Sequence, residues 1–251
     1  MVATGVKAMA VAPERGERET HGRAERGNLI VLRDRPQSPA AEAYRGVRTS
    51  LQLMPREKQV ALVVTSPTAG DGKTYCAVNV ASALAIAGKR VLLVGADMRR
   101  PTLHNVFGLQ QTDGLSEYLA EQSAAAEVHE TNIAGLDLLQ SGRIPPNPSE
   151  LLGAARFTEG VAAWRNSYDH VVFDAPPVLG VTDALVLAQR VGRVLLVVRT
   201  GRTTDRELRR TVEHLRSAGV DVLGVILNGH KAGTEVYAAY GYTYPTFQAD
   251  R

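Results

Sequence analysis

The sequence has one cysteine, little net charge and no long apolar run. A single cysteine, Cys76, among 251 residues excludes an intrachain disulfide framework and favours a reducing compartment. The net charge of +3 is too small to indicate a nucleic-acid partner, and none is expected. No apolar run approaches the roughly 18 residues of a membrane span, and the N-terminus lacks the order of a signal peptide. We therefore expect a soluble, cytoplasmic protein that reaches a membrane only through a partner.

The sequence does contain short apolar runs that alternate with helical patterns. The runs predict strands at 60–65, 90–95, 136–142, 170–175, 193–200 and 220–229. The patterns between them predict helices at 73–87, 114–121, 156–167, 181–190 and 203–218, after a first helix that Ser38-Pro39 begins. Strands that are apolar throughout indicate a mostly parallel central sheet with helices on both faces, which is a three-layer α/β fold.

The two ends of the chain differ in composition from the domain between them. Residues 1–36 include a stretch of alternating charge and glycine with little to bury, and they predict a disordered arm. Residues 37–232 hold the predicted elements, and residues 233–251 form a tyrosine-rich tail.

A glycine-rich loop, Gly70-Asp71-Gly72-Lys73-Thr74, lies between the first strand and the following helix. Such a loop turns backbone N–H groups and a helix N-terminus toward a phosphate, as in P-loop NTPases. Lys73 would bridge the β- and γ-phosphates, and the Thr74 hydroxyl would take a place on Mg²⁺. Pro67 replaces the first glycine of the usual pattern. The residues expected to bind ATP are Ala69, Gly70, Asp71, Gly72, Lys73, Thr74 and Tyr75.

Two other strands end in aspartate. Asp97 follows the run 90–95, and Asp174 ends the run 170–175 in the manner of a Walker-B aspartate. Because the carboxyl ends of parallel strands meet at one edge of a sheet, both carboxylates should face the phosphate loop. Lys73, Asp97 and Asp174 are the expected catalytic residues, and Thr74, Asp97 and Asp174 the expected Mg²⁺ ligands.

These segments together resemble the bacterial tyrosine kinases (BY-kinases) of capsule and exopolysaccharide synthesis. The resemblance covers the chain from about residue 37 and includes EAYRGVRTSL, SPTAGDGKT, ADMRRPTLH, SGRIPPNPSELL and YDHVVFDAPPVLGVTDA. It implies a P-loop NTPase fold, Mg-ATP, autophosphorylation on tail tyrosines and control of polysaccharide chain length. It also implies homo-oligomers such as rings, a cognate tyrosine phosphatase, and a membrane co-polymerase that activates the kinase and recruits it to the inner face of the plasma membrane.

The resemblance assigns roles to residues outside the loop. It implies that Glu42, Arg45 and Arg48 form a subunit interface, although i,i+3 pairs on a solvated helix face are the alternative. It implies that Asn228 reads the adenine edge, although a turn residue is the alternative. The phosphoacceptors would be four tyrosines, with a tail folded back on the domain as the alternative: Tyr237, Tyr240, Tyr242 and Tyr244.

One position departs from the family pattern D-x-D-x-R. In this chain the pattern reads Gly95-Ala96-Asp97-Met98-Arg99, so the first aspartate is absent. A carboxylate that accepts the tyrosine proton contributes on the order of 10²–10⁴ in rate. We therefore expect nucleotide binding to survive while tyrosine phosphorylation is slow or lost, and Gly95→Asp to raise it.

Three functions are compatible with these observations. The first is an ATP-dependent tyrosine kinase, which the tyrosine cluster favours. The second is a non-catalytic ATP-binding scaffold of polysaccharide assembly, which Gly95 favours. A partitioning ATPase is the third, but it would carry a lysine early in the loop, where this chain has Thr68.

Overall fold

The computed structural model describes residues 8–13, 30–54 and 61–230. The strands are β1 (Ala8–Pro13), β2 (Ala61–Thr65), β3 (Val91–Gly95), β4 (Val128–Glu130), β5 (Leu136–Leu139), β6 (His170–Asp174), β7 (Arg193–Arg199) and β8 (Asp221–His230). The helices are α1 (Val31–Asp34), α2 (Pro39–Gln52), α3 (Lys73–Ile86), α4 (Leu103–Phe107), α5 (Leu115–Leu119), α6 (Pro148–Gly153), α7 (Ala155–Ser167), α8 (Asp183–Val191) and α9 (Asp205–Ser217). In these ranges no helix has the length and apolar character that crossing a membrane requires.

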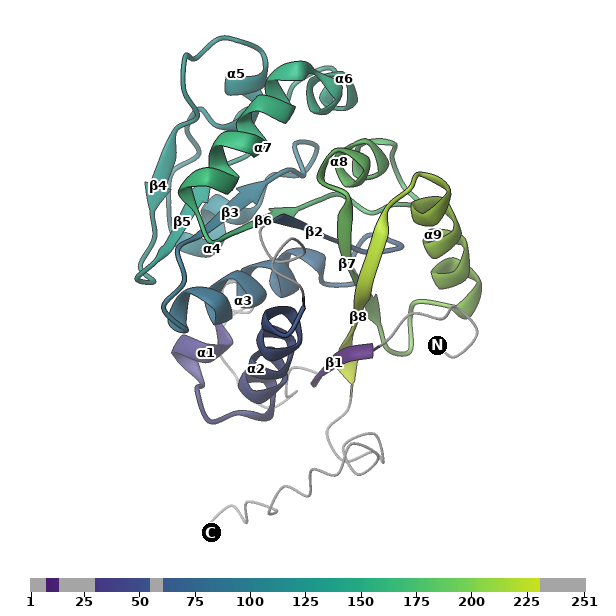
Figure 1. Cartoon of the computed structure of the whole chain (residues 1–251). Coiled ribbons are helices and arrows are strands. Elements are labelled where there is room, and N and C mark those ends of the chain that lie inside the picture. Colours follow the sequence, from purple (N-terminus) through teal and green to yellow (C-terminus); the bar gives the residue numbers. More distant parts are fainter. Residues whose placement is uncertain (1–7, 14–29, 55–60, 231–251) are drawn as a thin grey trace.

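The described strands form one sheet in the order β1-β8-β7-β2-β6-β3-β5-β4. Neighbouring strands are parallel except β4, which runs antiparallel to β5 at one edge. Helices α1, α2 and α3 lie on one face of the sheet, and α7, α8 and α9 lie on the other (Figure 1). The predicted three-layer, mostly parallel α/β fold is confirmed.

Alternate residues of the central strands β2, β3, β6 and β7 enter different cores, which explains why the interiors of these strands are apolar. In β3, Val91 and Leu93 pack with α3, whereas Leu92 and Val94 pack with α7 and α8. All four side chains are completely buried. Burial of one such side chain stabilises the fold by roughly 1.5–3 kcal/mol, so the strand interior tolerates no polar residue. Polar side chains therefore gather at the strand ends, where the sheet meets solvent.

Helix starts follow the capping residues of the sequence. Ser38 caps α2 by accepting from the Ala41 N–H (3.2 Å), and Pro39 occupies the first helical position. Thr204 and Glu207 form a reciprocal capping box at the start of α9.

The predicted disordered arm is wrong in two places. Residues 8–13 form β1, which pairs with β8, and α1 lies within the predicted arm at residues 31–34. Val31 and Leu32 are buried in the core beneath α2 and α3, and the Val31 N–H donates to Asn79 Oδ1 (2.7 Å). Three consecutive apolar residues stabilise this turn, although charged residues precede them in the sequence. Residues 1–7 and 14–29 of the predicted arm lie outside the described residues.

All six predicted strands and the predicted helices are present, with ends shifted by a few residues. The largest shift is in β5, which ends at Leu139 rather than at residue 142. The short elements β4, α4 and α6 were not predicted, because three to six residues are too few to show a period.

Candidate nucleotide-binding site

The loop from β2 to α3 is shaped by two glycines with positive φ. Gly70 has φ +87° and Gly72 has φ +93°, a region that other residues rarely adopt. A side chain at Gly72 would also collide with the amide nitrogen of Asn228. Helix α3 begins at the next residue, Lys73, so its positive N-terminal end opens onto the loop. The loop thus combines two positive-φ glycines with a helix start, and phosphate binding there stays a prediction.

Three side chains hold this loop in place. Asp71 Oδ2 accepts from the Thr68 N–H (2.9 Å) and hydroxyl (3.1 Å). From β8, Asn228 Nδ2 donates to the Asp71 carbonyl (2.8 Å). Arg202 Nη2, from the turn after β7, donates to the Ala69 carbonyl (2.9 Å). The side-chain amide nitrogen of Asn228 is therefore hydrogen-bonded to the loop, and a contact of Asn228 with adenine stays a prediction.

The three predicted catalytic side chains meet beside this loop. Lys73 Nζ lies 2.7 Å from Asp97 Oδ2 and 3.8 Å from Asp174 Oδ1. Asp97 follows β3 and Asp174 ends β6, and the two strands are neighbours in the sheet. Lys73 Nζ is also 3.4 Å from the Thr74 hydroxyl. One cation is thus held between two buried carboxylates.

Burial and charge act against each other on these groups. Burial lowers the pKa of Lys73, but Asp174 and Asp97 together raise it further, so the net shift is upward and the ammonium stays charged. Burial of Asp174 raises the pKa of its carboxyl by more than Lys73 and a hydrogen bond from Thr74 lower it. Asp174 is therefore a carboxylate whose ionisation depends on its cationic neighbour.

The residues present fit a magnesium ion. Asp174 Oδ1 is buried and has no hydrogen-bond partner, which leaves one unsatisfied acceptor beside the phosphate loop. Mg²⁺ prefers oxygen ligands and is commonly bound by one or two carboxylates together with nucleotide phosphates. Thr74 and Asp174 would hold the ion, with Asp97 as a further ligand once Lys73 turns to a phosphate. Such an ion would neutralise charge that develops on a transferred phosphoryl group.

The missing carboxylate at Gly95 has a defined place in the structure. Gly95 is paired in register with Asp174, so a side chain at position 95 would lie on the same face of the sheet. Its Cβ would come within 2.5 Å of Ser141 Oγ and 3.0 Å of the Ser141 backbone nitrogen. The site therefore has one carboxylate fewer than the family pattern, and Ser141 fills the adjacent space.

An ion pair that was not predicted from the sequence fixes the loop after β6. Arg99 Nε and Nη2 donate to the two oxygens of Asp183 (2.7 and 3.0 Å), which also accepts from Ser149. Burial raises the pKa of Asp183, but Arg99 and Ser149 lower it by more, so the carboxylate is charged. Arg99 was visible as the last residue of D-x-D-x-R, whereas the sequence has no signal that pairs it with Asp183. The contact of Arg202 with the Ala69 carbonyl was also not predicted, because no sequence pattern links these two positions.

Tyr75 and predicted interface residues of α2 make other contacts, and the predicted phosphoacceptors are not among the described residues. The Tyr75 ring packs edge-on against Tyr44 of α2, with ring centroids 6.2 Å apart, and a contact of Tyr75 with ATP stays a prediction. Arg45 donates to Glu42 (3.0 Å) and to the Pro36 carbonyl (2.6 Å). The bond to Glu42 is the i,i+3 pair within one helix that was the alternative to a subunit interface. A role of Glu42, Arg45 and Arg48 in a subunit interface stays a prediction. Tyr237, Tyr240, Tyr242 and Tyr244 lie outside the described residues.

Comparison with known proteins places the chain in a family. The family of the AAA domain matches residues 60–204. The tyrosine-protein kinase YwqD of Bacillus subtilis is 36% identical over 227 residues, which are 90% of this chain and 94% of YwqD. This chain belongs to the bacterial tyrosine kinases. Their catalytic domain is a P-loop NTPase, which agrees with the glycine loop and the strand-end aspartates of this site.

Two further relatives support the family. The kinase domain of the Escherichia coli tyrosine kinase ETK is 33% identical with a TM-score of 0.82, and the match covers 97% of this chain and 96% of that domain. The putative tyrosine-protein kinase EpsB of Ralstonia solanacearum is 42% identical over 231 residues. That match covers 87% of this chain but 31% of EpsB, so the chain spans about a third of this relative.

Proposed function

We propose that this chain is an ATP-dependent protein-tyrosine kinase that phosphorylates its own tyrosine cluster and regulates capsular or exopolysaccharide synthesis and chain length. The observation that carries the proposal is the meeting of Lys73, Asp97 and Asp174 at the phosphate loop, because phosphoryl transfer relies mainly on positioning and charge stabilisation. The partners would be further copies of the chain through Glu42, Arg45 and Arg48, a membrane co-polymerase and a cognate phosphatase. Localisation would be at the inner face of the plasma membrane.

In this proposal each side chain of the site has a separate role in phosphoryl transfer. Lys73 would leave Asp97 to bind the β- and γ-phosphate oxygens, and Asp174 would hold Mg²⁺ with Thr74. Asp97, released from Lys73, could accept the phenolic proton while the phenolic oxygen bonds to the γ-phosphorus and the bond from that phosphorus to the bridging oxygen breaks, which releases ADP. Because Asp97 also serves the metal, a site without a carboxylate at Gly95 should transfer phosphate slowly.

Gly95 supports a second candidate function, a scaffold that binds ATP without transferring phosphate. The two functions are separated by incubating the purified chain with Mg-ATP labelled at the γ-phosphate, with and without a co-polymerase cytoplasmic segment. The kinase predicts label on tyrosines between residues 237 and 244, and Asp174→Asn should remove that label. ATP binding without any label, even with the activating segment, would favour the scaffold.

Magnesium-dependent ATP binding should weaken as the pH falls. Asp174 must be ionised to hold Mg²⁺, and burial raises its pKa, so at a given acidic pH its protonated fraction exceeds that of an ordinary aspartate. Below that raised pKa we expect the Mg²⁺-dependent part of ATP affinity to fall about tenfold per pH unit. Isothermal titration calorimetry between pH 5 and 8 measures this, and Asp174→Asn is the control that should remove the pH dependence. An equal slope in the parent and in the variant would contradict the assignment.

A further inference from the structure

Helix α9 presents arginines on the surface of the domain. Its surface is hollowed along five residues that lie on successive turns: Asp205, Arg206, Arg209, Arg210 and Glu213. Between Arg190 and Arg216 the sequence holds eight arginines and three carboxylates, although the whole chain has a net charge of only +3. With eight arginines against three carboxylates, this segment is a local source of positive potential.

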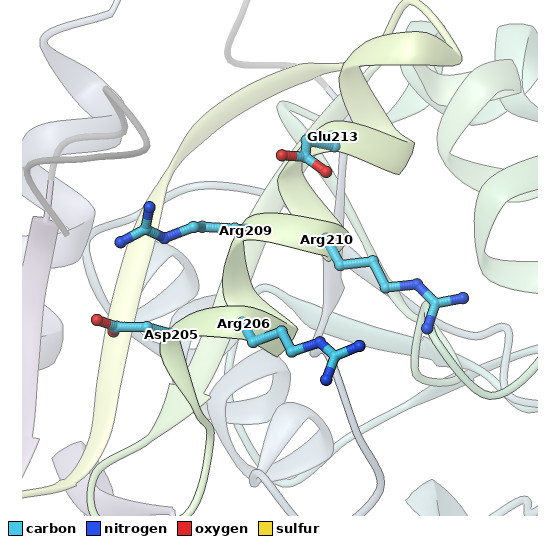
Figure 2. Close-up of a pocket in the computed structure, with 5 residues that line it drawn as sticks. All are labelled: Asp205, Arg206, Arg209, Arg210 and Glu213. Carbon is cyan, nitrogen blue, oxygen red and sulfur yellow. The ribbon is translucent and has the colours of Figure 1, made fainter.

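Within α9 the arginines are not equivalent. Arg206 and Arg210 extend to the same side of the helix, whereas Arg209 extends to the other side together with Asp205 (Figure 2). Arg206 and Arg210 are one turn apart, so their side chains start about 5–6 Å from each other. In the part of the chain that the structure describes, neither of them forms an ion pair, and both are exposed. They form a pair of guanidinium groups that a doubly charged ligand can bridge.

The tyrosine-rich tail begins near this helix. Strand β8, which ends at His230, lies beside β7, and the turn after β7 leads directly into α9. The Thr200 N–H donates to the Asn228 carbonyl (2.9 Å) at this point. From His230 to Tyr237 there are seven residues, which span up to about 25 Å when extended, while α9 is about 20 Å long. The first tail tyrosine can therefore reach the middle of α9 of its own chain.

The charge of the tail changes with phosphorylation. Residues 231–251 contain two basic and two acidic side chains, so the unmodified segment has no charge to attract α9. Each phosphotyrosine adds about −1.5 to −2 and three strong acceptor oxygens. Arginine binds a phosphoryl group through paired, charge-assisted hydrogen bonds, which suits Arg206 and Arg210.

A membrane surface is the less suitable occupant. The exposed residues of α9 are Asp205, Arg206, Arg209, Arg210, Glu213, Arg216 and Ser217, none of which is apolar. A helix that lies in a lipid interface needs an apolar face, and the apolar residues of α9 are buried against the sheet. The two carboxylates would also repel anionic lipids, whereas a single phosphoryl group at Arg206 and Arg210 lies on the side of the helix away from Asp205.

We propose that Arg206 and Arg210 bind a phosphotyrosine of the segment 231–251, in the same chain or in a second copy. The proposal rests on the proposed function, because the kinase reaction would supply the phosphotyrosine. Docking on α9 would hold a phosphorylated tail and leave the nucleotide site to an unmodified tail. The pair would thus distinguish product from substrate.

The test uses the full chain, first treated with a tyrosine phosphatase, and a fluorescent synthetic peptide of residues 235–246 phosphorylated at Tyr240 and Tyr242. Fluorescence anisotropy measures the affinity. We expect the phosphopeptide to bind at least tenfold more tightly than the unmodified peptide. Arg206→Gln with Arg210→Gln should weaken phosphopeptide binding at least tenfold, whereas Arg209→Gln, the matched control on the same helix, should change it less than threefold. Equal thermal unfolding of the variants confirms that the fold is intact.

Three results would overturn the proposal: equal affinity of the two peptides, unchanged binding in the double variant, or an equal loss with Arg209→Gln. Co-sedimentation of the chain with phosphatidylglycerol vesicles, lost in the double variant, would instead assign the pair to a membrane. Because the phosphate is placed by synthesis, the result does not depend on kinase activity. A chain that fails to phosphorylate itself but binds the phosphopeptide refutes only the proposed function.

Discussion

Lys73→Met is expected to abolish ATP binding and to lower the free energy of unfolding by about 3–5 kcal/mol at neutral pH. Lys73 lies 2.7 Å from Asp97 and 3.8 Å from Asp174, so its removal leaves two buried carboxylates without a cation. Denaturant unfolding at pH 7 measures the loss of stability, and calorimetry with Mg-ATP measures the loss of binding.

The pH dependence of this variant identifies the cause. The folded-state pKa of Asp174 is raised above its ordinary value of 3.8, so ionisation of Asp174 costs stability as the pH rises through the folded pKa. Stability should therefore return as the pH falls through that pKa toward 3.8. Lys73→Met combined with Asp174→Asn should recover part of the lost stability at pH 7, because only Asp97 then remains buried without its cation, and should still fail to bind ATP. Equal instability of the single and double variants would show that the charge of Asp174 is not the cause.

Gly95→Asp, combined with Ser141→Gly, is expected to raise tyrosine autophosphorylation about 10²-fold over the parent. The new carboxylate would lie beside Asp174, with which Gly95 is paired in register. Ser141→Gly is needed because Ser141 Oγ lies 2.5 Å from the position of a Cβ at residue 95. Transfer of labelled phosphate to the tail, followed over time with Mg-ATP, measures the effect.

Gly95→Asp alone and Ser141→Gly alone are the controls. The first should be less stable than the parent by about 1–3 kcal/mol, because the added side chain overpacks the space that Ser141 fills. Ser141→Gly alone should leave the transfer rate near that of the parent. If the double variant folds, binds ATP and transfers phosphate no faster than the parent, then the missing carboxylate does not limit the reaction.

The sequence was sufficient to predict those features that depend on residues close together in the chain. Apolar runs with aspartates at their ends predicted the strands and placed Asp97 and Asp174 at one edge, because parallel strands end on the same side of a sheet. The glycine spacing before Lys73 predicted the phosphate loop, because that motif lies within one short stretch of the chain. Local composition misled at residues 30–34, where three buried apolar residues, Ile30, Val31 and Leu32, begin a short helical turn after a charged stretch.

Other features depend on contacts between residues far apart in the chain. Arg99 meets Asp183 across 84 positions, Arg202 meets Ala69 across 133, and Asn228 meets Asp71 across 157. No periodic pattern links such residues, because each pair is brought together by loops that the packed sheet positions.

By itself, then, the sequence determined the order of the elements, the parallel sheet and the chemistry at the strand ends, since these depend on backbone preference and burial. Only the tertiary structure decided how Lys73 is shared between two carboxylates, what fills the space beside Gly95 and which residue pairs with Arg99. Those details depend on how side chains from separate elements fill a common volume, which is settled only when the layers pack together.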